Sequence, residues 1–182
     1  SGKTITTGYY KKPEATAAAI DKDGWFHTGD AGYLKGNHLY LTERIKDLFK
    51  TSNGKYISPQ ALETKLSIDR YIDQIAVIAD QRKFVSALIV PVYGLVKNYA
   101  KEKGLEYKDM VDLLQHPKVQ ALFRARIDTL QQQFAHYEQV KRFTLLSEPF
   151  SMERGELTNT LKLKRSVVAK NYKELIDKMY EE

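Results

Sequence analysis

The sequence contains no cysteine and only four histidines among its 182 residues. Without cysteine there is no disulfide framework, no thiolate zinc site and no cysteine nucleophile, and the composition fits a reducing compartment. The histidines are scattered, so we assign no residue to a metal. There is also no apolar run near the ~20 residues that a membrane span needs, and no signal-peptide pattern at the start. We therefore expect a cytoplasmic protein, with any membrane contact limited to the periphery.

Charge of one sign is not concentrated anywhere in the chain. The formal net charge is +6, from 29 Lys and Arg against 23 Asp and Glu. Residues 1–60 hold 9 basic and 6 acidic residues, and residues 61–182 hold 20 and 17, so each part contributes +3. Because a protein that follows a nucleic-acid backbone usually carries a basic stripe or tail, this distribution favours small anionic ligands over nucleic acid.

The sequence predicts too few helices and strands in the first part of the chain for that part to fold alone. Five of the ten glycines fall between residues 8 and 36, around a helical turn over 13–20 and a hairpin over 33–41. The Gly36-Asn37 pair would form the hairpin turn. Since these elements cannot bury a core by themselves, we interpret residues 1–42 as the tail of a larger domain.

From residue 48 onward the pattern predicts a complete small α+β domain, after a short charged connector over residues 43–47. A helix begins at Ser58-Pro59, where a hydroxyl cap precedes proline at the first helical position. The other predicted elements are an antiparallel pair of strands over 72–79 and 84–92, helices over 95–103, 107–114 and 117–134, a strand over 142–146 and one terminal helix with an apolar stripe over 168–179. The predicted domain therefore has a short hairpin, a small mixed sheet and flanking helices.

Residues 24–30 have a composition that is not typical of a purely structural segment. They are Gly-Trp-Phe-His-Thr-Gly-Asp and contain the only tryptophan. An ionised carboxylate such as Asp30, held after a glycine turn, is a pure acceptor that can take both hydroxyls of a ribose. An ordinary turn with a local Asx hydrogen bond is the alternative, and these residues alone favour it.

Residues 43–59 concentrate basic side chains around a glycine turn at the predicted domain boundary. Arginine suits fixed recognition of hydroxyl or phosphate oxygens, and glycine lets a thin ligand pass close to the backbone. Alternating lysines on a hairpin are more often its solvated face, and without further context we favour that interpretation. The residues concerned are Arg44, Lys46, Lys50, Gly54 and Lys55.

Residues 155–165 form a polar loop ahead of the last predicted helix. Lys162 falls where the chain is still extended, and from a loop its ammonium could reach a phosphate as a point charge. Lys164 and Arg165 begin the helix, so we expect them to face water.

Taken together and in order, four segments resemble the acyl-adenylate-forming family, which includes acyl-CoA synthetases, luciferases and the adenylation domains of peptide synthetases. They are GYYKKPEAT at 8–16, GWFHTGD at 24–30, RIKD at 44–47 followed by NGKYISP at 53–59, and LTNTLKLKR at 157–165. The ending and the helical insertion before it are similar to the long-chain fatty acid CoA ligase branch.

The resemblance implies a role for five residues. Asp30 and Arg44 would bind the ribose of ATP, and Lys46 would be the hinge about which a C-terminal lid domain over 48–182 rotates. Gly54 would line the tunnel for the pantetheine of CoA, and Lys162 would be the catalytic lysine that reaches the carboxylate and phosphate oxygens during adenylation.

The resemblance also implies the reaction of the intact enzyme, in which a long-chain fatty acid, Mg-ATP and CoA give acyl-CoA, AMP and pyrophosphate. Many family members have glycine directly before the lysine where this chain has Leu161, and long-chain members commonly have Thr-Leu-Lys there. The glycine-rich phosphate loop of the family is not found here, so we expect these residues alone to be inactive. Two alternatives stay open: a stand-alone binding or regulatory module, for example for nucleic acid, and a ligase of the same family for another carboxylic acid.

Overall fold

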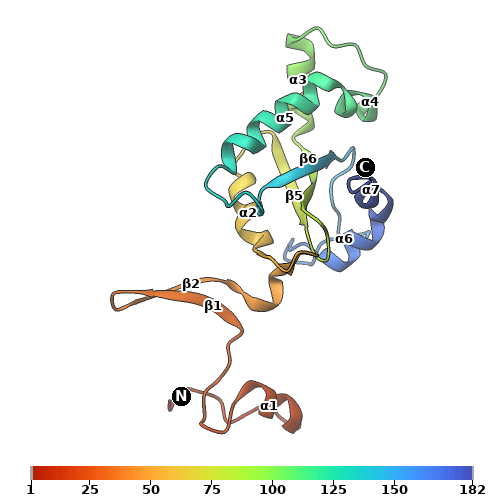
Figure 1. Cartoon of the computed structure of the whole chain (residues 1–182). Coiled ribbons are helices and arrows are strands. Elements are labelled where there is room, and N and C mark those ends of the chain that lie inside the picture. The colour runs from red at the N-terminus through yellow and green to blue at the C-terminus, as the bar shows by residue number, and fades with distance from the viewer. Residues whose placement is uncertain (1, 182) are drawn as a thin grey trace. The chain divides into compact units, whose positions relative to one another are not determined.

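The structure is a computed structural model that describes residues 2–181, apart from the side chain of Glu43. It divides the chain into two units, one that ends at Asp47 and one that begins at Leu48 (Figure 1).

The first unit contains a helix and a hairpin, and its described side chains form no buried core. Helix α1 spans Pro13–Ala19, and strands β1 (Asp30–Lys35) and β2 (His38–Arg44) pair antiparallel before a 3-10 turn, η1, over Ile45–Asp47. Gly36 adopts a left-handed φ of 60° in the hairpin turn, as the sequence predicts. None of residues 2–42 or 44–47 is buried, so in this unit the exposed apolar side chains of the hairpin contribute no core.

The second unit is built on a three-stranded mixed sheet with the order β5-β6-β7. Strand β5 (Ile72–Ile78) pairs antiparallel with β6 (Val85–Pro91), and β6 pairs parallel with β7 (Val140–Leu145). All seven residues of the central strand β6 are buried, which explains its unbroken apolar run. A short hairpin of β3 (Phe49–Lys50) and β4 (Tyr56–Ile57) precedes the sheet. The predicted α+β fold with a small mixed sheet is therefore confirmed.

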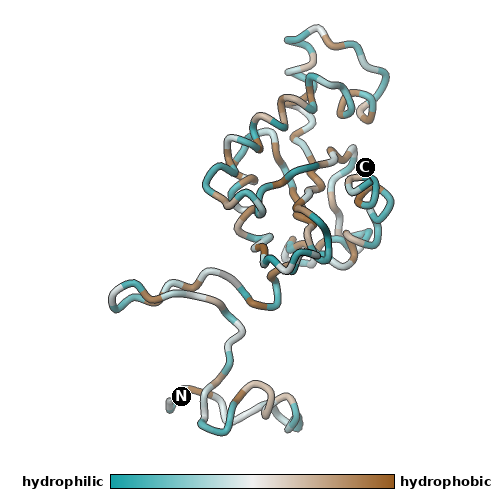
Figure 2. The backbone as a smooth tube through the Cα atoms, viewed as in Figure 1, coloured by the Kyte–Doolittle hydropathy of each residue, from teal (hydrophilic) through white to brown (hydrophobic). Residues whose placement is uncertain are grey.

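Helices cover the two faces of this sheet (Figure 1). Apolar residues, brown along the backbone in Figure 2, include the buried members of two separate clusters. Side chains alternate between the faces, so that Ile75 and Val77 join one cluster and Ala76 joins the other. The first cluster includes residues of α2 (Pro59–Leu66), α3 (Tyr93–Glu102), α4 (Met110–Gln115) and α5 (Pro117–Leu130), and the second includes residues of α6 (Arg165–Asn171) and α7 (Lys173–Lys178).

Helices α3 and α4 begin at Tyr93 and Met110, where the sequence predicts residues 95 and 107. Two larger differences, in the terminal helix and at the end of α5, involve contacts outside the helix. The single terminal helix is divided into α6 and α7 at Tyr172, whose φ of −106° is not helical and whose ring packs edge-on against Phe150. Helix α5 ends at Leu130 because the buried side chain of Gln131 accepts a 2.8 Å hydrogen bond from the backbone N–H of Val140.

Across the part of the chain that the structure describes, no helix has the length and apolar character that crossing a bilayer requires.

Candidate functional site

The structure brings Asp30 and Arg44 together across the hairpin of the first unit. They are register partners at the start of β1 and the end of β2, and Arg44 Nε lies 3.2 Å from Asp30 Oδ1. Their neighbours fix the turn, because Asp30 donates its N–H to Thr28 Oγ1 and Ile45 donates its N–H to the carbonyl of Gly29. Both side chains stay partly open to solvent. An acceptor and a donor therefore stand side by side, as recognition of vicinal hydroxyls requires.

Lys46 lies in the middle of η1, with its side chain exposed. This position is one residue before the end of the first unit. The backbone there forms a 3-10 turn rather than part of a longer helix or strand.

Gly54 lies at the tip of the β3–β4 hairpin and has a φ of 76°, a left-handed conformation that glycine adopts at little cost. The space around its Cα is open, with no heavy atom within 4 Å of the position that a Cβ would take. Buried Thr51 braces the turn, since its N–H donates to the carbonyl of Lys55 and its hydroxyl oxygen accepts the Lys55 N–H. The turn is thus an ordered and sterically open surface, as a thin ligand passing the backbone would need.

The lysines beside Gly54 lie on the solvated face that the sequence predicts for this hairpin. Lys50 and Lys55 are both exposed, and their ammonium groups lie over the rings of Tyr56 and Tyr137 at 5.9 and 5.5 Å.

Lys162 lies at the end of a tight loop in the second unit. Thr158 donates its N–H to the carbonyl of Lys162, and the Thr158 hydroxyl oxygen accepts the N–H of Lys162 at 3.0 Å. A bridge between Leu157 and Leu163 closes the base of the loop. The side chain of Lys162 is exposed. The hydrogen-bonded backbone therefore holds a lysine whose ammonium group is open to solvent.

Leu161, the residue that departs from the family's common glycine, has a φ of 60°. Such a left-handed conformation disfavours residues with a Cβ, which is a physical reason for glycine at this position. Its side chain is 68% exposed. The loop therefore keeps the left-handed turn with leucine in place.

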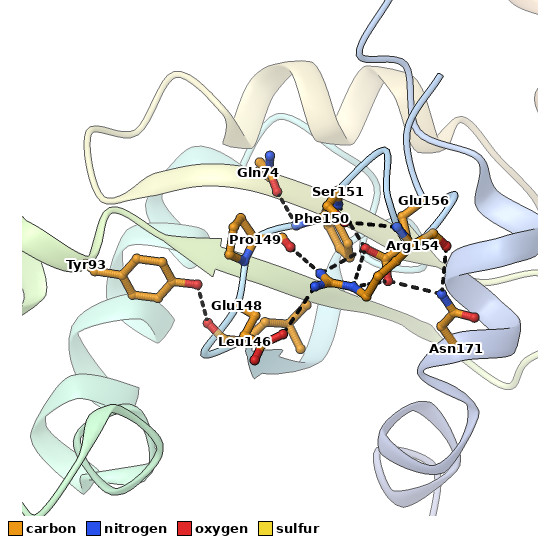
Figure 3. A network of polar contacts seen from close by, with 10 residues as sticks. All are labelled: Gln74, Tyr93, Leu146, Glu148, Pro149, Phe150, Ser151, Arg154, Glu156 and Asn171. Atoms are coloured by element: carbon orange, nitrogen blue, oxygen red, sulfur yellow. Dashed lines mark hydrogen bonds and ion pairs between the residues drawn. The ribbon is translucent and has the colours of Figure 1, made fainter. Parts of the chain in front are cut away.

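A buried carboxylate, which the sequence prediction missed, holds the base of this loop (Figure 3). Glu156 has no exposed surface and accepts hydrogen bonds from the N–H of Ser151, from Arg154 Nε and from Asn171 Nδ2. Burial acts to raise the pKa of Glu156, but the bond from Arg154 and the other two donors outweigh it and lower that pKa below its ordinary value. The Glu156 carbonyl also accepts the Lys164 N–H at 2.7 Å. No local sequence pattern marks a glutamate as buried, which is why it was missed.

Arg154, on the rim of this network, links the buried carboxylate to the surface (Figure 3). It pairs with exposed Glu148 at 3.2 Å and donates to the carbonyl of Pro149. The network therefore ties the polypeptide before the Lys162 loop into one polar cluster.

The prediction that Lys164 and Arg165 both face water is right for Lys164 and wrong for Arg165. Lys164 is exposed, whereas the Arg165 side chain is only 29% exposed and forms two 2.6 Å bonds to the carboxylate of Glu63. Because Glu63 lies 102 residues earlier in the chain, sequence spacing gave no sign of this pair.

Comparisons with known proteins show the family and the fold of this chain. The family model for the AMP-binding enzyme C-terminal domain matches residues 46–182. Over 187 aligned residues the chain is 36% identical to peroxisomal long chain acyl-CoA synthetase 6 from Arabidopsis thaliana, covering 100% of this chain and 26% of that protein. It is also 36% identical to long-chain-fatty-acid–CoA ligase 5 from Rattus norvegicus, covering 99% of this chain and 27% of that protein.

A solved structure supports the same assignment. The A domain of carboxylic acid reductase from Segniliparus rugosus, in complex with AMP and a co-purified carboxylic acid, superposes with a TM-score of 0.76 at 26% identity. The match covers 99% of this chain and 27% of that chain.

These comparisons identify residues 46–182 as an AMP-binding enzyme C-terminal domain. The chain belongs to the AMP-binding enzyme family, and its curated relatives include long-chain fatty acid CoA ligases. It spans about a quarter of the length of these relatives.

Proposed function

We propose that these residues are the C-terminal part of an ATP-dependent long-chain fatty acid CoA ligase. Residues 1–42 are then the tail of the large nucleotide-binding domain, residues 43–47 the hinge and residues 48–182 the lid domain. The observation that carries the proposal is the exposed Lys162 on a loop with a fixed backbone. The sequence around it is similar to a long-chain synthetase over the whole of this chain.

In this proposal the Asp30 and Arg44 pair binds the nucleotide through its ribose. The Asp30 carboxylate accepts hydrogen bonds from the ribose hydroxyls, and Arg44 donates to a ribose oxygen from the same edge of the hairpin. Their spacing of 3.2 Å and partial exposure suit a bidentate contact with two adjacent hydroxyls.

Lys162 serves the first half-reaction. A fatty acid carboxylate oxygen bonds to the α-phosphorus of ATP, the bond to the β-phosphate oxygen breaks, and pyrophosphate leaves with its electron pair. The oxygens around phosphorus gain negative charge during this step, so a cation held in place lowers its barrier. The exposed stem of Lys162 allows its ammonium to reach them.

The second half-reaction uses the Gly54 turn. The CoA sulfur bonds to the acyl carbon, AMP leaves with the oxygen, and the thiol proton is released. Glycine at φ 76° leaves open space where pantetheine would pass the backbone. On this proposal Mg²⁺ arrives bound to ATP, and no residue of this chain is assigned to the metal.

The proposal also covers the remaining predictions from the sequence. The chain by itself is expected to be inactive, to act in the cytoplasm or at a membrane periphery, and to bind no nucleic acid. The identity of the acyl substrate is the most specific element of the proposal, and its support is similarity to long-chain relatives.

The decisive experiment compares the two half-reactions in the intact ligase with palmitate as the acid. Replacing Lys162 with alanine should slow pyrophosphate release by roughly 10²–10³-fold, the usual effect of losing one transition-state donor. Thioester formation from supplied palmitoyl-adenylate and CoA should stay near the wild-type rate.

Lys164→Ala is the matched control, because Lys164 is an exposed lysine two residues away. It should leave both half-reactions unchanged. Equal loss of both half-reactions in Lys162→Ala would contradict the role of Lys162, and faster turnover of octanoate than palmitate in the wild type would contradict the long-chain assignment.

A further inference from the structure

We propose that Glu63 and Arg165 form a positioning pair that sets the place of the Lys162 loop and so controls adenylation without contacting substrate. This inference rests on the proposed function. It assigns a role in the reaction to two residues that lie outside the residues expected to touch ATP, acid or CoA.

The pair joins three parts of the second unit at one carboxylate. Arg165 Nη1 and Nη2 donate to the two oxygens of Glu63 at 2.6 Å each, in the bidentate geometry that fixes both side chains. Glu63 Oε1 also accepts the N–H of Val77 at 2.8 Å, and the guanidinium lies 5.5 Å from the ring centre of Phe49. Helix α2, strand β5 and the start of α6 therefore meet at this point.

A cavity lies beside the Glu63–Arg165 pair, which distinguishes this pair from an ordinary surface ion pair. The cavity has a volume of about 330 Å³ and separates part of the segment after Lys162 from strand β5. Its lining includes Phe49, Val77, Leu163, Arg165 and Ser166. The segment is therefore located by the polar pair together with the apolar contacts that Leu163 and Val168 make in the second cluster.

The position of Arg165 in the chain links the pair to Lys162. Arg165 is the first residue of α6 and follows Lys162 by three residues. Buried Glu156 joins the two sides of the loop through Ser151 and Lys164. The Glu63–Arg165 pair then attaches the side after the loop to helix α2 and strand β5. Without the pair the loop would keep its internal bracing but lose this attachment to helix α2 and strand β5.

Loss of the pair should therefore act on the step that needs Lys162. A displacement of about 1 Å in a catalytic group can cost on the order of 10²-fold in rate. In the intact ligase we expect Arg165→Met to slow pyrophosphate release from ATP and palmitate by about 10- to 100-fold. The same variant should form thioester from supplied palmitoyl-adenylate at close to the wild-type rate, which also shows that the domain is folded.

Two further variants separate position from charge. Glu63→Gln keeps an oxygen for the Val77 N–H but loses the ion pair, and it should show the same selective loss. Arg165→Lys keeps one charged contact to Glu63 and should recover part of the adenylation rate. Because both residues act through one contact, combining Arg165→Met with Glu63→Gln should add little further loss.

The matched control is Arg126→Met, at a pair of the same design elsewhere in the domain. Arg126 Nε lies 2.7 Å from Asp69, whose carboxylate accepts the N–H of Tyr71, and the Arg126 guanidinium lies over the Tyr71 ring. This pair is not adjacent in sequence to the Lys162 loop. Its loss should lower thermal stability and leave the ratio of the two half-reaction rates unchanged.

The outcomes are distinguishable. A wild-type ligase that forms no acyl-adenylate would overturn the proposed function and this inference with it. An active wild type whose Arg165→Met variant keeps its adenylation rate, or loses both half-reactions equally, would overturn the positioning role alone.

Discussion

At the scale of single residues, Glu156 shows how a buried charge can serve a loop. An isolated carboxylate in an apolar interior is very unfavourable, and donors must compensate for the lost hydration. Ser151, Arg154 and Asn171 supply those donors, and the Glu156 carbonyl holds the N–H of Lys164. One residue thus ties together the two sides of the loop that presents Lys162.

We expect Glu156→Gln to lower the free energy of unfolding by about 1–3 kcal/mol at pH 7, because the charge partner of Arg154 is lost in a buried site. The pKa of Glu156 is lowered in the folded state. Its contribution is therefore present above the unfolded pKa of about 4.3 and is lost as the pH falls through the folded pKa. Urea unfolding at pH 7 and at pH 3 should show the difference between wild type and variant narrowing at the lower pH.

Glu148→Gln is the control for this measurement. Glu148 also pairs with Arg154, but its side chain is 73% exposed. Exposed ion pairs contribute little, so this variant should change stability by less than about 1 kcal/mol. A larger effect from Glu148 than from Glu156 would contradict the account of the network.

At the scale of elements, the short turn η1 between the two units is the predicted hinge. Its residue Lys46 is exposed and lies in a 3-10 turn, whose φ values are close to the −65° that proline imposes. We expect Lys46→Pro to fold normally, yet to slow overall turnover on the order of tenfold or more, because a fixed φ hinders the rotation between half-reactions. Stopped-flow measurement of each half-reaction would test this.

Lys46→Ala is the matched control, since it removes the same side chain and leaves φ free. It should retain turnover. Wild-type rates for both steps in Lys46→Pro would show that the hinge lies elsewhere.

The sequence predicted those elements whose signals are local. The start of α2 could be predicted because Ser58 supplies a hydroxyl cap and Pro59 is a proline at the first helical position. In the structure Ser58 Oγ does accept the N–H of Ala61. The break at Tyr172 and the end of α5 could not be predicted, since they depend on Phe150 and Val140, which are distant in the chain. The same limit applies to the proposed site: Asp30, Arg44 and Lys162 lie in recognisable motifs, whereas Glu63 enters the proposal through its contact with Arg165, 102 residues later.

At the scale of the whole molecule, the two units differ in what they bury. The second unit has apolar clusters on both faces of its sheet, whereas none of residues 2–42 or 44–47 is buried. The hairpin of the first unit leaves its apolar side chains exposed, among them Leu34, Leu39 and Leu41. Stability of the chain is therefore expected to come from residues 48–182.

We expect a chain reduced to residues 48–182 to fold cooperatively, with the same thermal midpoint as residues 1–182. Calorimetry and dispersed amide NMR signals would check this. A peptide of residues 1–47 is the complementary control and should lack dispersed signals. A truncated chain without a cooperative transition would show that the first unit contributes to the core.

The bracing of the Lys162 loop also has a thermodynamic consequence. Restricting a backbone residue to one conformation costs about 1–2 kcal/mol of entropy. The hydrogen bonds of Thr158 and the bridge between Leu157 and Leu163 restrict these residues when the domain folds, before any substrate binds. The loop therefore loses this conformational entropy once, when the domain folds, and does not lose it again each time substrate binds.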